Sequence, residues 1–165
     1  MRYSLTDYIL SIKVPDELRD VFLTSSSDTT DESANRISIG GDGSYLGSIK
    51  TTSATQWSTE GDATGSYIHN KNKSKVGTLS VELNQLSDVV LKLTRLIETY
   101  YSADTVTSGL TLTISKATGA GNSIDVCTCI DCYLTKQPDG GWSDKADNMS
   151  FEFTCGKVTY SGNAM

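Results

Sequence analysis

The sequence predicts a mainly β domain of antiparallel strands with one α-helix. Three observations support this prediction: only 2 prolines against 14 glycines in 165 residues, several segments in which apolar and polar residues alternate, and one segment with helical periodicity. A chain of this length falls within the roughly 100 to 200 residues usual for one domain. Abundant serine and threonine, with few strong helix-forming stretches, also favour strands.

The clearest strand signal runs from Lys75 to Leu83, where the side chains alternate with the period of a half-buried strand. The apolar face comprises Gly77, Leu79, Val81 and Leu83. The opposite, mostly polar face comprises Val76, Thr78, Ser80 and Glu82.

After this strand the apolar period changes to that of an α-helix, with Ser87 as its N-cap and a span of residues 87–101. One stripe is expected to face the core: Leu86, Val89, Val90, Leu93, Leu96 and Ile97.

The remaining segments complete the β domain. Further strands are expected at residues 7–14, 36–39, 46–52, 56–60, 67–71, 109–116, 123–136 and 148–160. Residues 46–83 thus form a long hairpin with a polar tip, and the acidic residues 15–35, without any period, form a long exposed loop. A short helical turn is expected at residues 16–22, and a glycine turn at residues 40–43.

The bulk properties exclude two classes of function. A net charge of −6 and a pI near 4.7 argue against a protein that grips nucleic acid, which needs clustered cations. No apolar run approaches the 18 or so residues of a membrane helix, so we expect no membrane insertion. We expect the chain to be made and folded in the cytosol, where disulfides are rare.

The four cysteines allow two interpretations. Cys129 and Cys132 have the Cys-x-x-Cys spacing of a zinc site, and Cys155 could join them if the last strand pairs alongside. Strand alternation, however, places Cys127 and Cys129 on one face and Cys132 on the other. The favoured interpretation is therefore small apolar side chains packed in a sheet, with no metal and no cofactor.

No reaction motif accompanies the other candidate residues, so we predict that the protein is not an enzyme. His69 lies in a polar segment without a nucleophile elbow, and the Gly40–Gly43 turn lacks the lysine and the hydroxyl residue of a phosphate-binding loop. Lys71, Lys73 and Lys75 are either a solvated edge or one half of an interface charge pair. The opposite charges would be Asp28, Asp31 and Glu32 of another copy.

Exposed aromatic residues keep a binding function open. Tryptophan and tyrosine are enriched in interfaces, although a place in the core or at its edge is as good an interpretation for each. The residues concerned are Trp57, Tyr67, Tyr100, Tyr101 and Trp142. They would serve as a platform if the protein were a soluble β-sandwich binding module for a carbohydrate or protein ligand.

Residues 36–96 carry a family resemblance. Its elements are a glycine-rich segment at 40–47, Gln56-Trp57 followed by Gly61-Asp62 and Gly65, the strand Lys75-Val-Gly-Thr-Leu, and Leu83-Asn-Gln-Leu-Ser-Asp88 before the helix. In this order they resemble phage tail tube proteins, the inner-tube subunits of contractile tails and of phage-tail-like bacteriocins.

The resemblance implies a β-sandwich or half-barrel with a flanking helix, whose strands join a multi-subunit β-barrel in stacked hexameric rings. The whole chain, 1–165, would be one tail-tube domain. The candidates for the face toward the lumen are Ser48, Lys50, Thr52, Thr78, Ser80 and Glu82. The candidates for contacts between subunits and rings are Asp28, Asp31, Glu32, Glu60, Asp62, Lys71 and Lys73.

It also implies partners and a location. Besides copies of itself, the subunit would meet a sheath protein, baseplate or initiator proteins and a tail terminator. A tape-measure protein or DNA would occupy the lumen without tight binding. The chain would be made in the cytoplasm of a bacterial host and end in a virion tail or a released tail-like particle. A binding module, in contrast, would run as a monomer or dimer in gel filtration.

Overall fold

The computed structural model describes residues 4–15, 36–40, 46–102, 109–119 and 121–161. In chain order its elements are η1 (Leu5–Asp7), β1 (Tyr8–Lys13), β2 (Arg36–Ile39), β3 (Leu46–Ser53), β4 (Trp57–Gly61), β5 (Tyr67–Lys71), β6 (Gly77–Asn84), α2 (Asp88–Ser102), β7 (Leu110–Gly119), β8 (Asn122–Leu134) and β9 (Asn148–Tyr160). Apart from Pro15, the predicted loop at 15–35 lies outside the described residues, and so do the helical turn at 16–22 and residues 41–43 of the glycine turn.

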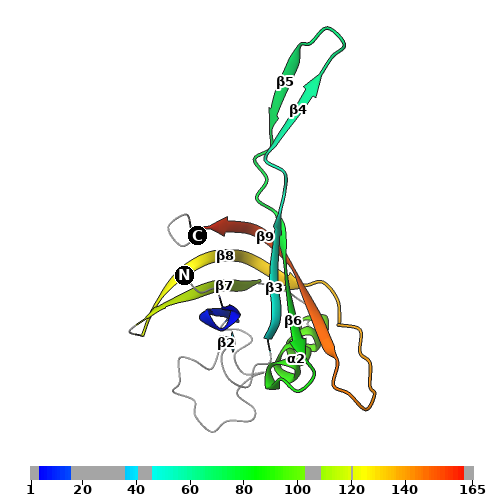
Figure 1. Cartoon of the computed structure of the whole chain (residues 1–165). Coiled ribbons are helices and arrows are strands. Elements are labelled where there is room, and N and C mark those ends of the chain that lie inside the picture. The colour runs from blue at the N-terminus through cyan, green and yellow to red at the C-terminus, as the bar shows by residue number, and fades with distance from the viewer. Residues whose placement is uncertain (1–3, 16–35, 41–45, 103–108, 120, 162–165) are drawn as a thin grey trace.

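Seven strands form one antiparallel sheet in the order β2-β1-β7-β8-β9-β6-β3, curled into a half-barrel, and α2 packs against it (Figure 1). The mainly β half-barrel predicted from the sequence is confirmed, as one curled seven-stranded sheet beside a separate two-stranded one. Strand β9 joins the two halves of the curl, since residues 148–155 pair with β6 and residues 153–160 pair with β8.

The core lies on the inner face of the curl, and strand alternation selects its residues. In β6 every second side chain is buried and the intervening ones are half-buried, as predicted. The largest side chains with no exposed surface come from five strands and the helix: Phe151, Phe153, Leu10, Ile12, Ile39, Leu79, Leu83, Leu93, Leu96, Leu110 and Leu112, with Val14 just after β1.

Helix α2 begins after a cap made by Ser87. The Ser87 hydroxyl accepts a hydrogen bond from the backbone N–H of Val89 at 3.3 Å, which is the expected N-cap contact. Val89, Val90, Leu93, Leu96 and Ile97 are buried. Leu86 is not part of this stripe, because it lies in the turn before the cap and 64% of its surface is exposed.

One local irregularity overturns the predicted arrangement of the cysteines. Asp131 has a φ of 58°, in the left-handed region that Asp tolerates better than most residues. The register between β7 and β8 shifts at this point, as in a β-bulge, so both Ile130 and Asp131 are exposed. Cys132 therefore shares the buried face with Cys127 and Cys129, and the prediction that it faces the other way is wrong.

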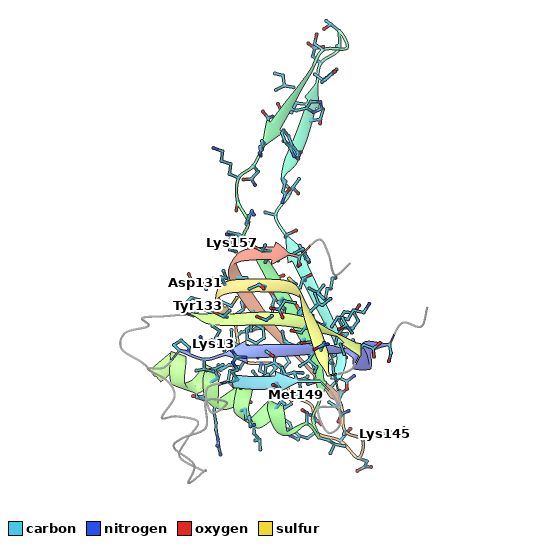
Figure 2. The ribbon with its side chains drawn as sticks, turned by 90° about the vertical axis from the view of Figure 1, so that its left-hand side faces the viewer. Lys13, Asp131, Tyr133, Lys145, Met149 and Lys157 are labelled. Atoms are coloured by element: carbon cyan, nitrogen blue, oxygen red, sulfur yellow. The ribbon has the colours of Figure 1, made fainter. Side chains whose placement is uncertain are left out.

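Two glycines make room for this bulge. A Cβ on Gly109 would lie 2.9 Å from the Asp131 backbone, and a Cβ on Gly156 would lie 3.4 Å from the Asp131 Cβ. Lys157, next to Gly156 on β9, is also exposed. The alternation of buried and exposed residues is therefore interrupted at the same level in both β8 and β9. Asp131 and Lys157 lie on the adjoining strands at this bend (Figure 2).

The segment from Leu46 to Asn84 is one long hairpin in two parts. Strands β3 and β6 pair within the sheet, and β4 and β5 form a separate two-stranded arm that projects away from the body (Figure 1). Two backbone hydrogen bonds span the neck between the parts, from Ala54 N to Val76 O and from Asn72 N to Gln56 O.

Leu93→Asp should strongly destabilise the protein, because it places a carboxylate among fully buried apolar side chains. The expected loss in the free energy of unfolding is about 4 kcal/mol or more. Leu91→Asp is the matched control, since Leu91 lies on the same helix with 68% of its surface exposed. Urea denaturation followed by circular dichroism measures both. Equal stability of the two variants would mean that α2 does not pack as described.

Gly109→Ala should cost about 1–3 kcal/mol of unfolding free energy, because the new methyl group overlaps the Asp131 backbone. The control is Gly61→Ala, where the nearest atom to the new Cβ is 3.7 Å away. Thermal unfolding of the two variants measures the difference. A Gly109→Ala protein as stable as the control would contradict the close packing of the bulge.

Candidate functional site

The outer face of β3, β6 and β9 is a continuous polar surface. The six residues predicted to face a lumen form three direct cross-strand pairs: Ser48 with Glu82, Lys50 with Ser80, and Thr52 with Thr78. These six residues lie on the face opposite the core, because the intervening residues of β6 are the buried ones. The structure thus brings these six residues together on one face.

Hydrogen bonds between side chains order this face. The hydroxyls of Thr52 and Thr78 are 2.5 Å apart, and the Ser48 hydroxyl donates to Glu82 Oε2 at 3.4 Å. The other carboxylate oxygen of Glu82 accepts from Asn148 Nδ2 at 2.9 Å, and Asn84 Nδ2 donates to Asn148 Oδ1 at 3.2 Å. Glu82 therefore ties β3 to the start of β9.

Strand β9 extends the polar surface by a third row. Ser150, Glu152 and Thr154 pair with Glu82, Ser80 and Thr78 respectively. Alternation marks them as the polar side of the last strand, but the sequence does not predict that this strand pairs with β6. We call the nine residues of the three rows the polar face. It carries six hydroxyl side chains, Lys50, Glu82 and Glu152, so its charges leave a small negative excess.

The arm formed by β4 and β5 has one face rich in aromatic rings. Trp57 pairs with Lys71, whose Nζ lies 5.6 Å from the centroid of the indole ring. Thr59 pairs with His69, with 2.8 Å between the threonine hydroxyl and Nδ1, and the His69 ring is 5.2 Å from that of Tyr67. Trp57 and Tyr67 are 57% and 68% exposed, so the arm presents apolar surface that its own body does not cover.

Asp62 has a local role at the tip of the arm. Its Oδ1 accepts hydrogen bonds from the hydroxyl and the N–H of Thr64 and from the N–H of Ser66. These bonds, the Thr64 hydroxyl first, lower the pKa of the Asp62 carboxyl. Three other predicted interface residues, Glu60, Lys71 and Lys73, are exposed on the arm and neck. The remaining three, Asp28, Asp31 and Glu32, lie outside the described residues.

The sheet has two unpaired edges among the described strands. β3 pairs only with β6 and β2 only with β1, so each offers backbone N–H and C=O groups on its outer side. Natural proteins usually cover such edges or pair them with another chain.

The described residues hold no group of three or more His, Cys, Asp or Glu side chains placed to bind a metal ion. His69 is exposed on the arm and bonded to Thr59. No helix in the described part of the chain is long and apolar enough to span a membrane.

The described residues thus form a half-barrel with an ordered polar face, two unpaired edge strands and an exposed aromatic arm. Residues 41–161 match the family model described as bacteriophage PhiTE tail tube protein. The chain belongs to this family, which gives it a structural role in a phage tail or a related particle.

The chain is also similar to two solved structures. One is the sheath/tube terminator of an extracellular contractile injection system, PVC, in its extended state, with a TM-score of 0.54, 10% identity and 98% of each chain covered. Another is the tube-terminating cap of the anti-feeding prophage, with a TM-score of 0.49, 9% identity, and 98% of this chain and 93% of the other covered. At such identities the first likeness shows the fold alone. No curated protein matches the sequence.

Glu82→Lys should leave the fold intact but cost about 1–2 kcal/mol of unfolding free energy, because two side-chain hydrogen bonds are lost. Glu152→Lys makes the same charge change on the same face at an exposed position of β9, and a smaller loss is expected. Circular dichroism and urea denaturation test both variants. If Glu82→Lys abolished folding, Glu82 would not lie on a solvent-facing surface.

Proposed function

We propose that this protein is the inner-tube subunit of a phage tail or a phage-tail-like bacteriocin, and that it assembles into stacked hexameric rings around a hollow channel. The observation that carries the proposal is the polar face: three neighbouring strands turn hydroxyl-rich rows away from a dry core, within a chain of the tail tube family. In a monomer this face is ordinary solvated surface. In a ring it is the wall of an aqueous lumen.

The open edges of the sheet support ring formation. In the proposed ring, edge strands of neighbouring copies lie side by side and extend the sheet from one subunit to the next. Closing the ring removes the exposed edges, which would otherwise pair without control. A closed ring also requires a heterologous contact, in which two different patches of one chain meet, and β2 and β3 are two such patches.

The composition of the polar face suits a conduit. Serine and threonine hydroxyls are well hydrated, and the two glutamates outnumber the single lysine. A phosphate backbone is repelled weakly by such a wall, because tight binding needs several clustered cations. DNA or a tape-measure protein in the lumen would therefore slide without sticking.

The arm is proposed to hold subunits and rings together. Aromatic residues dominate the binding energy of many interfaces, and the exposed face of the arm concentrates them. Lys71 and Lys73, with Glu60 and Asp62 nearby, supply charges of both signs that orient the contact. The acidic residues Asp28, Asp31 and Glu32 are proposed to meet the lysines of a neighbouring copy.

The proposed tube implies further partners. Its ends would contact baseplate or initiator proteins and a tail terminator, and its outer surface would contact a sheath protein if the tail is contractile. The subunit would be made in the cytoplasm of a bacterial host. It would then leave the cell as part of a virion tail or a tail-like particle, which conducts DNA or punctures a target envelope.

Trp57→Ala should weaken assembly without unfolding the subunit. Truncating an interface aromatic of this kind costs about 2 kcal/mol or more when it is a hot spot, so the concentration needed for assembly should rise roughly thirtyfold or more. Trp142→Ala is the matched control, since Trp142 is an 88% exposed tryptophan away from the arm. Sedimentation velocity over a concentration series measures assembly, and circular dichroism checks the fold.

Equal assembly of the two variants would exclude the arm as a main contact. A wild-type protein that stays monomeric or dimeric at every concentration and salt tested, with its initiator complex present, would instead favour the soluble binding module.

A further inference from the structure

The bulge at Asp131 gathers all four cysteines into one buried cluster. Cys129, Cys132 and Cys155 have no exposed surface, and Cys127 has 2%. Cys129 lies close enough to the other three thiols for all of them to raise its pKa. We call these residues the thiol cluster. The tail-tube function proposed above makes no use of it.

Cys132 and Cys155 lie directly opposite each other on β8 and β9. Three positions further along the chain, just after the end of β8, the N–H of Thr135 donates to the carbonyl of Glu152 at 3.0 Å, so these two residues form a hydrogen-bonded pair. Hydrogen-bonded and non-hydrogen-bonded pairs alternate along an antiparallel ladder, which makes Cys132 and Cys155 a non-hydrogen-bonded pair. Such pairs have Cα atoms about 4.5 Å apart, within the range of about 4.4–6.8 Å that a disulfide requires.

One thiol of the cluster has a lowered pKa, and another lines a cavity. The interactions with Cys129 and then with Cys132 lower the pKa of the Cys155 thiol. Cys127 lines a cavity of about 190 Å³ together with Tyr8, Ile49 and Tyr160. That volume exceeds the roughly 30 Å³ share of a water molecule several times, so a small oxidant fits inside.

We propose that Cys132 and Cys155 form a cross-strand disulfide when the protein meets a peroxide outside a reducing compartment. Hydrogen peroxide oxidises the Cys155 thiol to a sulfenic acid with release of one water, and the Cys132 thiol then displaces the hydroxyl group as a second water. The two thiols lose two electrons and two protons in total, one S–S bond forms, and the peroxide is reduced to two waters. The disulfide links β8 to β9 beside the bend and stabilises the half-barrel.

The experiment treats the folded protein with hydrogen peroxide, blocks remaining thiols with iodoacetamide and digests the protein with trypsin without reduction. Cleavage after lysine leaves Cys155 in the peptide 146–157 and the other three cysteines in the peptide 117–136. Mass spectrometry should find these two peptides linked in the wild type and separated after dithiothreitol treatment. Fragmentation of the linked pair should assign the bond to Cys132.

Two variants distinguish the partner of Cys155. Cys127→Ser leaves Cys129, Cys132 and Cys155 in place and should cross-link at a rate within about twofold of wild type, whereas Cys132→Ser should cross-link at least tenfold more slowly. Cross-linking of Cys132→Ser at the wild-type rate, or no cross-link in the folded wild type, would overturn the proposal.

A measurement on the wild type alone covers the case in which a variant fails to fold. The peroxide-treated protein should unfold at a higher urea concentration than the untreated protein, and dithiothreitol should remove the gain. A treated protein that is cross-linked but no more stable would contradict the stabilising role. Because this test uses the isolated subunit, its outcome is independent of whether the protein forms tubes.

Discussion

Strand β9 belongs to both halves of the curled sheet, and the rest of the structure depends on how it bends between them. Its first residues pair with β6 beside the polar face, and its last residues pair with β8 on the far side of the core. At the bend, the alternation of buried and exposed residues is interrupted in both β8 and β9. Asp131 on β8 adopts a left-handed backbone conformation, and Gly156 and Gly109 leave the space that this conformation needs. Without the bend, the two halves could not enclose a common core with α2.

The register of β6 connects the stability of the core with the proposed function. β6 lies between β3 and β9, and its alternate side chains divide between a fully buried core and the polar face. A slip of one residue in this register would turn Leu79 and Val81 outward and bury Glu82, so the core specifies which residues can line a channel. In the proposed ring, the polar face lines the channel, and the edges that a monomer leaves exposed are paired.

Local patterns predicted most of the fold. Alternation located the strands and identified the buried face of β6, and it also placed Ser48, Lys50 and Thr52 across from the polar residues of β6. Two predictions failed because a single residue broke the period: Asp131 turned Cys132 inward, and the cap at Ser87 left Leu86 outside the helix. The pairing of β9 with β6 was not predictable, since it joins segments about 70 residues apart in the chain and leaves no local signal.

The most direct test of the central claim, that the polar face lines a channel, is electron cryo-microscopy of the assembled protein at high concentration with its initiator complex. We expect stacked rings of six subunits in which β3, β6 and the first half of β9 face an open lumen, while the arm contacts a neighbouring subunit or ring. A reconstruction in which the polar face lies on the outside of the particle, or in which no rings form, would contradict the account.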